Sequence, residues 1–147
     1  MALPGRPPRD LAADLAAIRA WGAAMLVTLV QAEEFERYGV ADFAAQVARS
    51  GLDWRRFPIP DMAPPDEAFA AAWRARGGDV VAALRAGSRV AMHCVGGLGR
   101  TGTVAARLLV VFGTEPEAAI ARVRQVRPGA IETAAQADFV RHRAPLG

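Results

Sequence analysis

One short segment of the chain concentrates residue types that can do chemistry. Residues 90–106 read VAMHCVGGLGRTGTVAA and contain the only cysteine among the 147 residues, Cys94. His93 precedes this cysteine, and Arg100 follows it after a glycine-rich run. A cysteine thiolate is a nucleophile, and the planar guanidinium of an arginine can hold two oxygens of a phosphate. The spacing therefore predicts that Cys94 attacks a bound phosphoryl group.

The elements around this segment favour an anion site. Residues 88–94 are typical of a short strand, and the apolar run 101–113 is typical of a buried helix. A glycine-rich turn between a strand and a helix directs backbone N–H groups at one point, and the helix dipole adds positive charge there. These groups also favour the thiolate form of the cysteine. The residues expected to bind phosphate are Val95, Gly96, Gly97, Leu98, Gly99 and Arg100.

The stretch HCVGGLGRTG resembles the signature loop of cysteine-dependent protein phosphatases, in which histidine and cysteine are followed by five residues, arginine, serine or threonine, and glycine. The resemblance implies that Cys94 is the nucleophile and Arg100 the phosphate clamp. It also implies that Thr101 stabilises the departing thiolate and that His93 hydrogen-bonds the backbone beside the cysteine. Further matching stretches cover most of the chain and are similar to the dual-specificity type, in particular its cyclin-dependent kinase inhibitor 3 branch.

Cleavage of a phosphate ester also needs an acid, because the leaving oxygen must gain a proton. Asp61 lies 33 residues before Cys94, in a stretch, FPIPD, that resembles the acid loop of the dual-specificity branch. Asp66 is the alternative, although its sequence context favours a helix N-cap. Asp53 lies inside a segment that is typical of a strand. We therefore predict Asp61 as the acid.

Two further polar residues, Glu132 and Gln136, follow the loop in the stretch VRPGAIETAAQADFV. Glu132 stands where resemblance to the larger tyrosine phosphatases places a water-orienting glutamine, and Arg127 is a candidate to neutralise its charge. The alternative is that Glu132 is a solvated residue that leads into a helix. Gln136 matches a second family glutamine, but it also has capping-box spacing with Thr133, which gives it a structural role.

The order of apolar segments predicts an α/β fold with a central, mostly parallel sheet flanked by helices, in a single domain over residues 1–147. The proline-rich start is expected to fray, and the long helix that follows residue 66 is expected to break at Gly77–Gly78. The expected strands are 23–30, 52–59 and 88–94. Helices are expected after Asp10, over 41–51, from 66 to 85 and over 101–113. A further helix is expected to start from a capping box of Thr114 and Glu117, and the last expected helix spans 133–143.

Composition narrows the cellular setting. All 18 basic residues are arginines, and the net charge of +3 is too small to indicate nucleic-acid binding. The arginine, alanine, glycine and proline content is typical of a GC-rich bacterial genome. A single cysteine cannot form an internal disulfide, and no secretion signal or membrane span is visible, so we expect a cytoplasmic protein without membrane insertion. Two histidines and one cysteine do not make a zinc set, and no cofactor is expected.

The expected activity is hydrolysis of phosphate monoesters through a cysteinyl-phosphate. The expected partners are a phosphorylated protein or peptide, with phosphotyrosine and then phosphoserine or phosphothreonine as the reacting residue, and oxyanions such as phosphate, sulfate or vanadate in the loop. A phosphoinositide phosphatase ranks lower because the loop residues between Cys94 and Arg100 are uncharged. A rhodanese-like sulfur transferase and an inactive phospho-motif binding module are the remaining alternatives.

Overall fold

Three parallel strands form the central sheet of the computed structural model, which describes residues 1–142. The strands are β1 (Ala23–Thr28), β2 (Asp53–Arg56) and β3 (Arg89–His93), in the order β2-β1-β3. The middle strand β1 carries a nearly continuous run of buried side chains. Such a run is expected where helices cover both faces of a parallel sheet.

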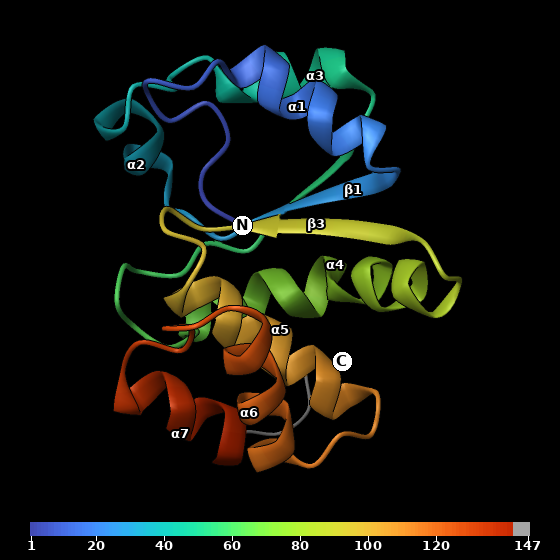
Figure 1. Ribbon diagram of the computed structural model, residues 1–147, viewed down its shortest axis with the longest axis vertical. Helices are drawn as coiled ribbons and strands as arrows, with labels where there is room; N and C mark the ends of the chain where they lie inside the picture. Colours follow the sequence, from blue (N-terminus) through green and yellow to red (C-terminus); the bar gives the residue numbers. More distant parts are fainter. Residues whose placement is uncertain (143–147) are drawn as a thin grey trace.

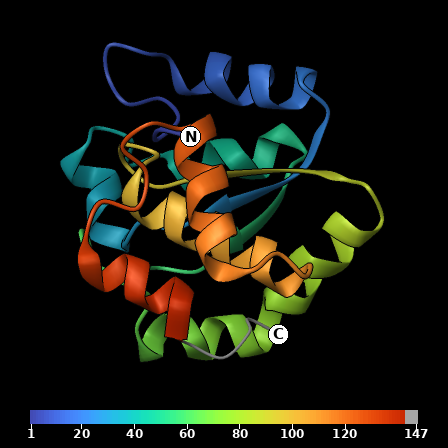
Figure 2. The ribbon, with the colours of Figure 1, turned by 60° about the horizontal axis from the view of Figure 1, so that its bottom comes forward.

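Helices cover both faces of this sheet (Figure 1). The helices α1, α2 and α3 lie on one side, and α4, α5, α6 and α7 lie on the other. Their bounds are α1 Leu11–Ala20, α2 Ala32–Arg37, α3 Phe43–Ser50, α4 Glu67–Arg85, α5 Gly99–Val111, α6 Pro116–Val126 and α7 Ala134–His142. Figure 2 shows α6 crossing in front of α5, with α7 beside it. The predicted α/β fold with a parallel sheet between helices is confirmed.

The segment after β2 is anchored by aromatic packing and by backbone hydrogen bonds. The ring of Phe57 lies 4.7 Å from that of Trp73 and 6.0 Å from that of Phe69, both on α4. The backbone N–H groups of Phe57 and Ile59 donate to carbonyls at the end of β1. Since Ile59 is completely buried, the chain that leads to Asp61 has a defined path.

Two expectations about the elements are wrong, and one short helix was missed. Helix α4 runs without a break through Gly77, because Gly77 lies under the indole of Trp73, one turn earlier in the same helix. The start of the chain does not fray: Leu3 is completely buried, and its N–H donates to the carbonyl of Val95 over 2.9 Å. Helix α2, which was not predicted, is only one and a half turns long, too short to produce an apolar period.

Two helix starts also differ from the prediction. The N-cap of α6 is Glu115 and not Thr114, and its carboxylate accepts from the N–H of Glu117 over 3.0 Å. Helix α5 begins at Gly99, two residues before the predicted start. The early start places Arg100 on the first turn of the helix, which directs its side chain across the loop. Residue 143, at the end of the last predicted helix, lies outside the described residues.

No helix within residues 1–142 combines the length and the apolar character that a membrane span requires.

The two adjacent glycines of α4 provide a matched pair for a stability measurement. A Cβ on Gly77 would overlap the Trp73 indole, whereas one on Gly78 would meet no atom within 4 Å. We expect Gly77→Ala to lower the free energy of unfolding by about 1–3 kcal/mol, because the core must shift. Gly78→Ala should raise it by about 0.5–1 kcal/mol, because alanine stabilises an exposed helix position. Urea denaturation measures both values, and effects of the same sign would contradict this account of α4.

Candidate active site

The loop between β3 and α5 holds Cys94 at the carboxyl end of the sheet. Cys94 is 3% exposed, and the N–H of Gly97 donates to its Sγ over 3.2 Å. Gly97 has φ of +73°, in the left-handed region that favours glycine, and this conformation turns its N–H inward. A backbone N–H aimed at the sulfur is the arrangement that a nest for an anion requires. The predicted strand–loop–helix unit is therefore present.

The close approach of two side chains explains why residue 99 of the loop is a glycine. The carboxylate of Glu132 and the side-chain amide of Gln136 occupy the space that a Cβ on Gly99 would need. Gly96 is different, because its missing Cβ faces open space. The lack of a side chain at Gly99 thus brings two polar groups from the segment before α7 and from α7 itself against the loop.

Arg100 is held from behind by a buried carboxylate. Its side chain is 2% exposed, and Nη1 and Nη2 donate to the two oxygens of Glu34 over 2.8 and 2.9 Å. Nη1 also donates to the carbonyl of Ile59 over 3.0 Å, and Nη2 lies 3.2 Å from Oδ1 of Asp61. Both protons of Nη1 are therefore used, which leaves the edge formed by Nε and Nη2 for a ligand.

The Arg100–Glu34 pair is ionised. Burial alone would raise the pKa of Glu34, but hydrogen bonds from Arg100 and from the backbone of Gln31 outweigh it and lower that pKa. Burial likewise opposes the charge of Arg100, but its bonds to Glu34 raise the pKa of the guanidinium. Removing one partner of such a buried pair leaves an uncompensated charge, so each residue requires the other.

Sequence reasoning missed Glu34. The stretch QAEEFER gives no signal that separates Glu34 from its neighbour Glu33. Glu34 is 2% exposed, whereas Glu33 is exposed. The pairing with Arg100 joins residues 66 positions apart in the chain, a separation that no local pattern reports.

The structure brings Asp61 to Arg100, as its predicted role requires. Its carboxylate is 58% exposed and lies within ion-pair distance of the guanidinium. The loop around it is tied on both sides, by Arg100 to the carbonyl of Ile59 and by Gln136 to the carbonyl of Ala63. The alternative acid, Asp66, caps α4 and accepts from the N–H of Phe69 over 3.0 Å, which confirms its prediction as an N-cap.

Gln136 organises the segment that carries Glu132. Its side-chain oxygen accepts from the N–H groups of Glu132 and Thr133 over 2.9 and 3.2 Å, and its own N–H donates to the Thr133 hydroxyl. The predicted capping box is therefore confirmed. Arg127 does not neutralise Glu132, contrary to expectation; its Nη2 donates to the carbonyl of Gly96 over 3.2 Å.

His93 lies within a buried hydrogen-bond chain that runs from Trp54 to the backbone of Cys94. The Trp54 indole donates to the hydroxyl of Thr28. This hydroxyl in turn donates to Nε2 of His93 over 2.7 Å. The Nδ1–H of His93 then donates to the carbonyl of Cys94 over 3.0 Å. Burial is the largest cause of the lowered pKa of His93, about 4, which keeps the ring neutral. Sequence reasoning predicted the bond to the backbone but missed Thr28 and Trp54.

Thr101 is in place, but its predicted role has no hydrogen bond to support it. The Thr101 hydroxyl is buried and has no hydrogen-bond partner within residues 1–142. The nearby hydroxyl of Thr103 instead donates to the carbonyl of Gly99 over 2.7 Å. Among the same described residues, no cluster of histidine, cysteine, aspartate and glutamate side chains could hold a metal ion.

The comparison with protein families decides the assignment. Residues 6–140 match the family described as PTP-SAK, Swiss Army Knife protein, DSP-PTPase phosphatase domain. The chain belongs to this family. The PTP-SAK chain is 29% identical to cyclin-dependent kinase inhibitor 3 of Rattus norvegicus over 135 residues, which are 90% of the chain and 62% of the relative. It is 31% identical to protein tyrosine phosphatase type IVA 2 of Mus musculus over 116 residues, 69% of the chain and 65% of the relative. The chain spans less than two thirds of the length of these relatives.

Solved structures agree with the PTP-SAK assignment. Kinase associated phosphatase (KAP), with its catalytic-site cysteine replaced by serine, has a TM-score of 0.84 and 27% identity and covers 95% of this chain and 80% of its own. Tk-PTP in its active form has a TM-score of 0.74 and 27% identity, with 95% and 85% covered. The fold of the PTP-SAK chain is thus that of phosphatases of the dual-specificity and tyrosine types.

The neutral His93 makes the stability of the PTP-SAK domain depend on pH. Its pKa falls from 6.5 to about 4 on folding, so the unfolded chain binds a proton in the range between these values and the folded chain does not. Above pH 6.5 the burial of neutral His93 costs no stability, and the free energy of unfolding decreases as the pH falls from 6.5 toward 4. Relative to His93→Asn, we expect the native chain to lose about 3 kcal/mol more between about pH 7 and pH 4. Denaturant unfolding at several pH values measures this, and parallel curves for both proteins would refute it.

Proposed function

We propose that this chain is a cysteine-dependent phosphatase that hydrolyses phosphate monoesters through a cysteinyl-phosphate intermediate. One observation carries the proposal: Cys94 accepts from the inward N–H of Gly97 and interacts electrostatically with Arg100, whose fork in turn meets the carboxylate of Asp61. A nucleophile, an anion nest, a fixed cation and a proton donor are the groups that the reaction needs.

Binding of the substrate places the phosphorus above the sulfur. The phosphoryl oxygens accept hydrogen bonds from the loop N–H groups and from the Nε–Nη2 edge of Arg100, because the other edge of that guanidinium is held by Glu34. Asp61 faces the same Nη2 group, and from there its carboxyl group reaches the ester oxygen. The ion pair with Glu34 keeps the arginine fork in one orientation before substrate arrives, which reduces the ordering cost of binding.

The first chemical step transfers the phosphoryl group to the enzyme. The bond between Sγ of Cys94 and phosphorus forms while the bond to the ester oxygen breaks, and protonated Asp61 gives its proton to that oxygen. The alcohol or phenol leaves, and Asp61 remains as a carboxylate. The uncharged residues of the loop and Arg100 hold the three remaining phosphoryl oxygens.

The second step returns the enzyme to its starting state. A water attacks the phosphorus, Asp61 takes up one of its protons, and the thiolate of Cys94 leaves. Glu132 and Gln136 lie against Gly99 at the rim of the loop, where they orient this water. Thr101 donates to the departing thiolate after a rotation of its hydroxyl, which has no partner within residues 1–142.

The proposed substrates are phosphotyrosine and phosphoserine or phosphothreonine in proteins. The names of the relatives support this class, since they include protein tyrosine phosphatases and a kinase associated phosphatase. A cytoplasmic location in a bacterium and a single domain over 1–147 belong to the same proposal. Family membership favours phosphate transfer over rhodanese-like sulfur transfer. Phosphoinositides remain a second candidate, and inositol phosphates belong in the same substrate panel as phosphopeptides.

The covalent step is tested by two variants of the loop. Cys94→Ser should abolish turnover of p-nitrophenyl phosphate but keep vanadate binding, because the nest consists of backbone and arginine groups. Arg100→Lys should reduce kcat/KM by about a hundredfold or more, since a point charge cannot replace the fork. Turnover by Cys94→Ser within tenfold of the native rate would refute the covalent mechanism, and a native protein without turnover would identify a binding module.

The acid is identified by its dependence on the leaving group. Asp61→Asn should slow alkyl phosphates and simple phenyl phosphates by about a hundredfold or more, but should affect aryl esters of strongly acidic phenols much less, because those phenolates leave without a proton. Asp66→Asn is the control, as asparagine caps a helix equally well. The assignment must move to Asp66 if only the control variant shows this dependence in a leaving-group series.

Glu132 is tested on the second step. Glu132→Ala should show a larger burst of product than the native protein and a steady-state rate that is lower by about tenfold or more, because the attacking water loses its acceptor. Glu132→Gln should retain most of the rate, since an amide oxygen also accepts a hydrogen bond. Stopped-flow kinetics separate the two phases. A native steady-state rate in the alanine variant would show that Asp61 alone positions the water.

A further inference from the structure

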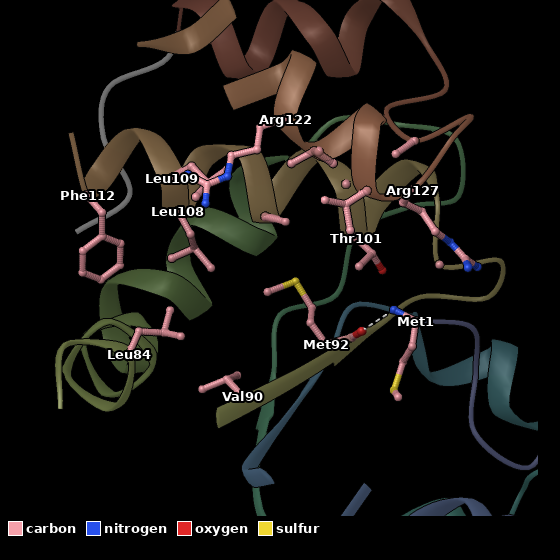
Figure 3. Close-up of a pocket in the computed structure, with 16 residues that line it drawn as sticks. Met1, Leu84, Val90, Met92, Thr101, Leu108, Leu109, Phe112, Arg122 and Arg127 are labelled. Atoms are coloured by element: carbon pink, nitrogen blue, oxygen red, sulfur yellow. Dashed lines mark hydrogen bonds between the residues drawn. The ribbon is translucent and has the colours of Figure 1, made fainter. Parts of the chain in front are cut away.

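A large apolar cavity lies beside the phosphate loop and is not used by the proposed reaction. Its volume is about 650 Å³, within the range of small-molecule sites. Figure 3 shows it between β3 and α5, with Met92 pointing into it, Leu84 and Phe112 at one end and Arg127 at the other. None of the reacting residues Cys94, Arg100 and Asp61 lines it. The cavity therefore adjoins the phosphate loop through Gly97 and Thr101 but does not contain the sulfur, the guanidinium or the carboxylate that react.

Exposed apolar side chains form part of the cavity lining. Five large apolar side chains within residues 1–142 are exposed, and three of them line this cavity: Met1, Phe112 and Val126. Val126 is 80% exposed, at the last position of α6. Water contact at these side chains is unfavourable, and a ligand with an apolar body would relieve it.

The charges at the cavity are all of one sign. Arg122 and Arg127 are its charged lining side chains, and none of its sixteen described lining residues is acidic. Neither arginine forms an ion pair within residues 1–142. The guanidinium of Arg85 adds a third cation, 5.8 Å from the ring centre of Phe112. An apolar interior under a cationic rim matches a molecule with an apolar chain and an anionic head.

We propose that this cavity binds a single-chain amphiphilic anion, of the long-chain carboxylate class. The chain lies along Met92, Leu108 and Leu109, and the carboxylate meets Arg122 at the rim. Gly97, Thr101 and Gly102 form part of the same wall. Because Gly97 also donates to the sulfur of Cys94, an occupant would contact the phosphate loop from its outer side. The binding itself does not depend on the proposed catalytic activity.

The methionines make the test specific, since they report from different places. Met92 lines the cavity, Met25 lies in the core, and Met62 follows Asp61 on the acid loop. In the full chain with ¹³C-labelled methionine methyl groups, dodecanoate below its micelle concentration should shift the Met92 signal saturably and leave Met62 in place. Saturating inorganic phosphate should not displace it. Calorimetry should show binding that tightens about fourfold with each methylene from octanoate to dodecanoate.

Variants at the rim of the cavity and a cationic amphiphile test which features of the cavity bind the ligand. Arg122→Glu and Val126→Asp are exposed substitutions that should weaken dodecanoate binding tenfold or more and leave phosphatase turnover unchanged, while Arg49→Glu on α3 should do neither. Decyltrimethylammonium should bind more weakly than decanoate. Four results would overturn the proposal: no saturable binding, displacement by phosphate with a shift at Met62, equal binding of the cationic amphiphile, or native affinity in both rim variants.

Discussion

The buried ion pair between Arg100 and Glu34 is the constraint on which the site depends. Two charges removed from water are tolerated only when they satisfy each other, and here two short hydrogen bonds do so. The pair joins α2, on one side of the sheet, to the first turn of α5, on the other. It also presents Nη1 of Arg100 to the carbonyl of Ile59, which ties the acid loop to the same guanidinium.

A second constraint acts on the backbone beside the two site carboxylates. Met62, next to Asp61, and Ile131, next to Glu132, have φ of 61° and 60°, and they are the only residues other than glycine with positive φ within 1–142. This conformation is costly, above all for the β-branched isoleucine. Hydrogen bonds hold it: the N–H of Ile131 donates to Leu98, and Arg124 donates to the carbonyl of Ile131. The strained positions thus lie directly beside two residues that we propose take part in the chemistry.

The parts of the site that could be predicted from the sequence are those that residues close together in the chain build by themselves. The loop from Cys94 to Arg100 is one continuous segment between a strand and a helix, and Asp66 caps the helix that it precedes. Asp61 could be proposed as the acid because its stretch, FPIPD, resembles the acid loop of the dual-specificity branch. Like the loop, the parallel sheet was predictable, since β1 is a local apolar run and strands alternate with helices along the chain.

The parts that could not be predicted depend on distant partners. Glu34 meets Arg100 across 66 positions, and Thr28 meets His93 across 65. The break expected at Gly77 is wrong for a local reason: the indole of Trp73, one turn earlier in α4, covers this glycine, and glycine propensity alone does not report that contact. The fraying expected at the chain start was wrong because Leu3 pairs with the loop residue Val95, which a composition rich in proline does not reveal.

The central claim is that the sulfur of Cys94 carries the phosphoryl group between the two steps. The most direct measurement is rapid acid quenching during turnover of an aryl phosphate, followed by proteolysis and mass spectrometry of the peptide that contains Cys94. The account predicts one added phosphoryl group on this cysteine, which forms at the rate of the product burst and decays when substrate is exhausted. Continued turnover with an unmodified Cys94 at every quench time, or with the phosphoryl group on another residue, would contradict it.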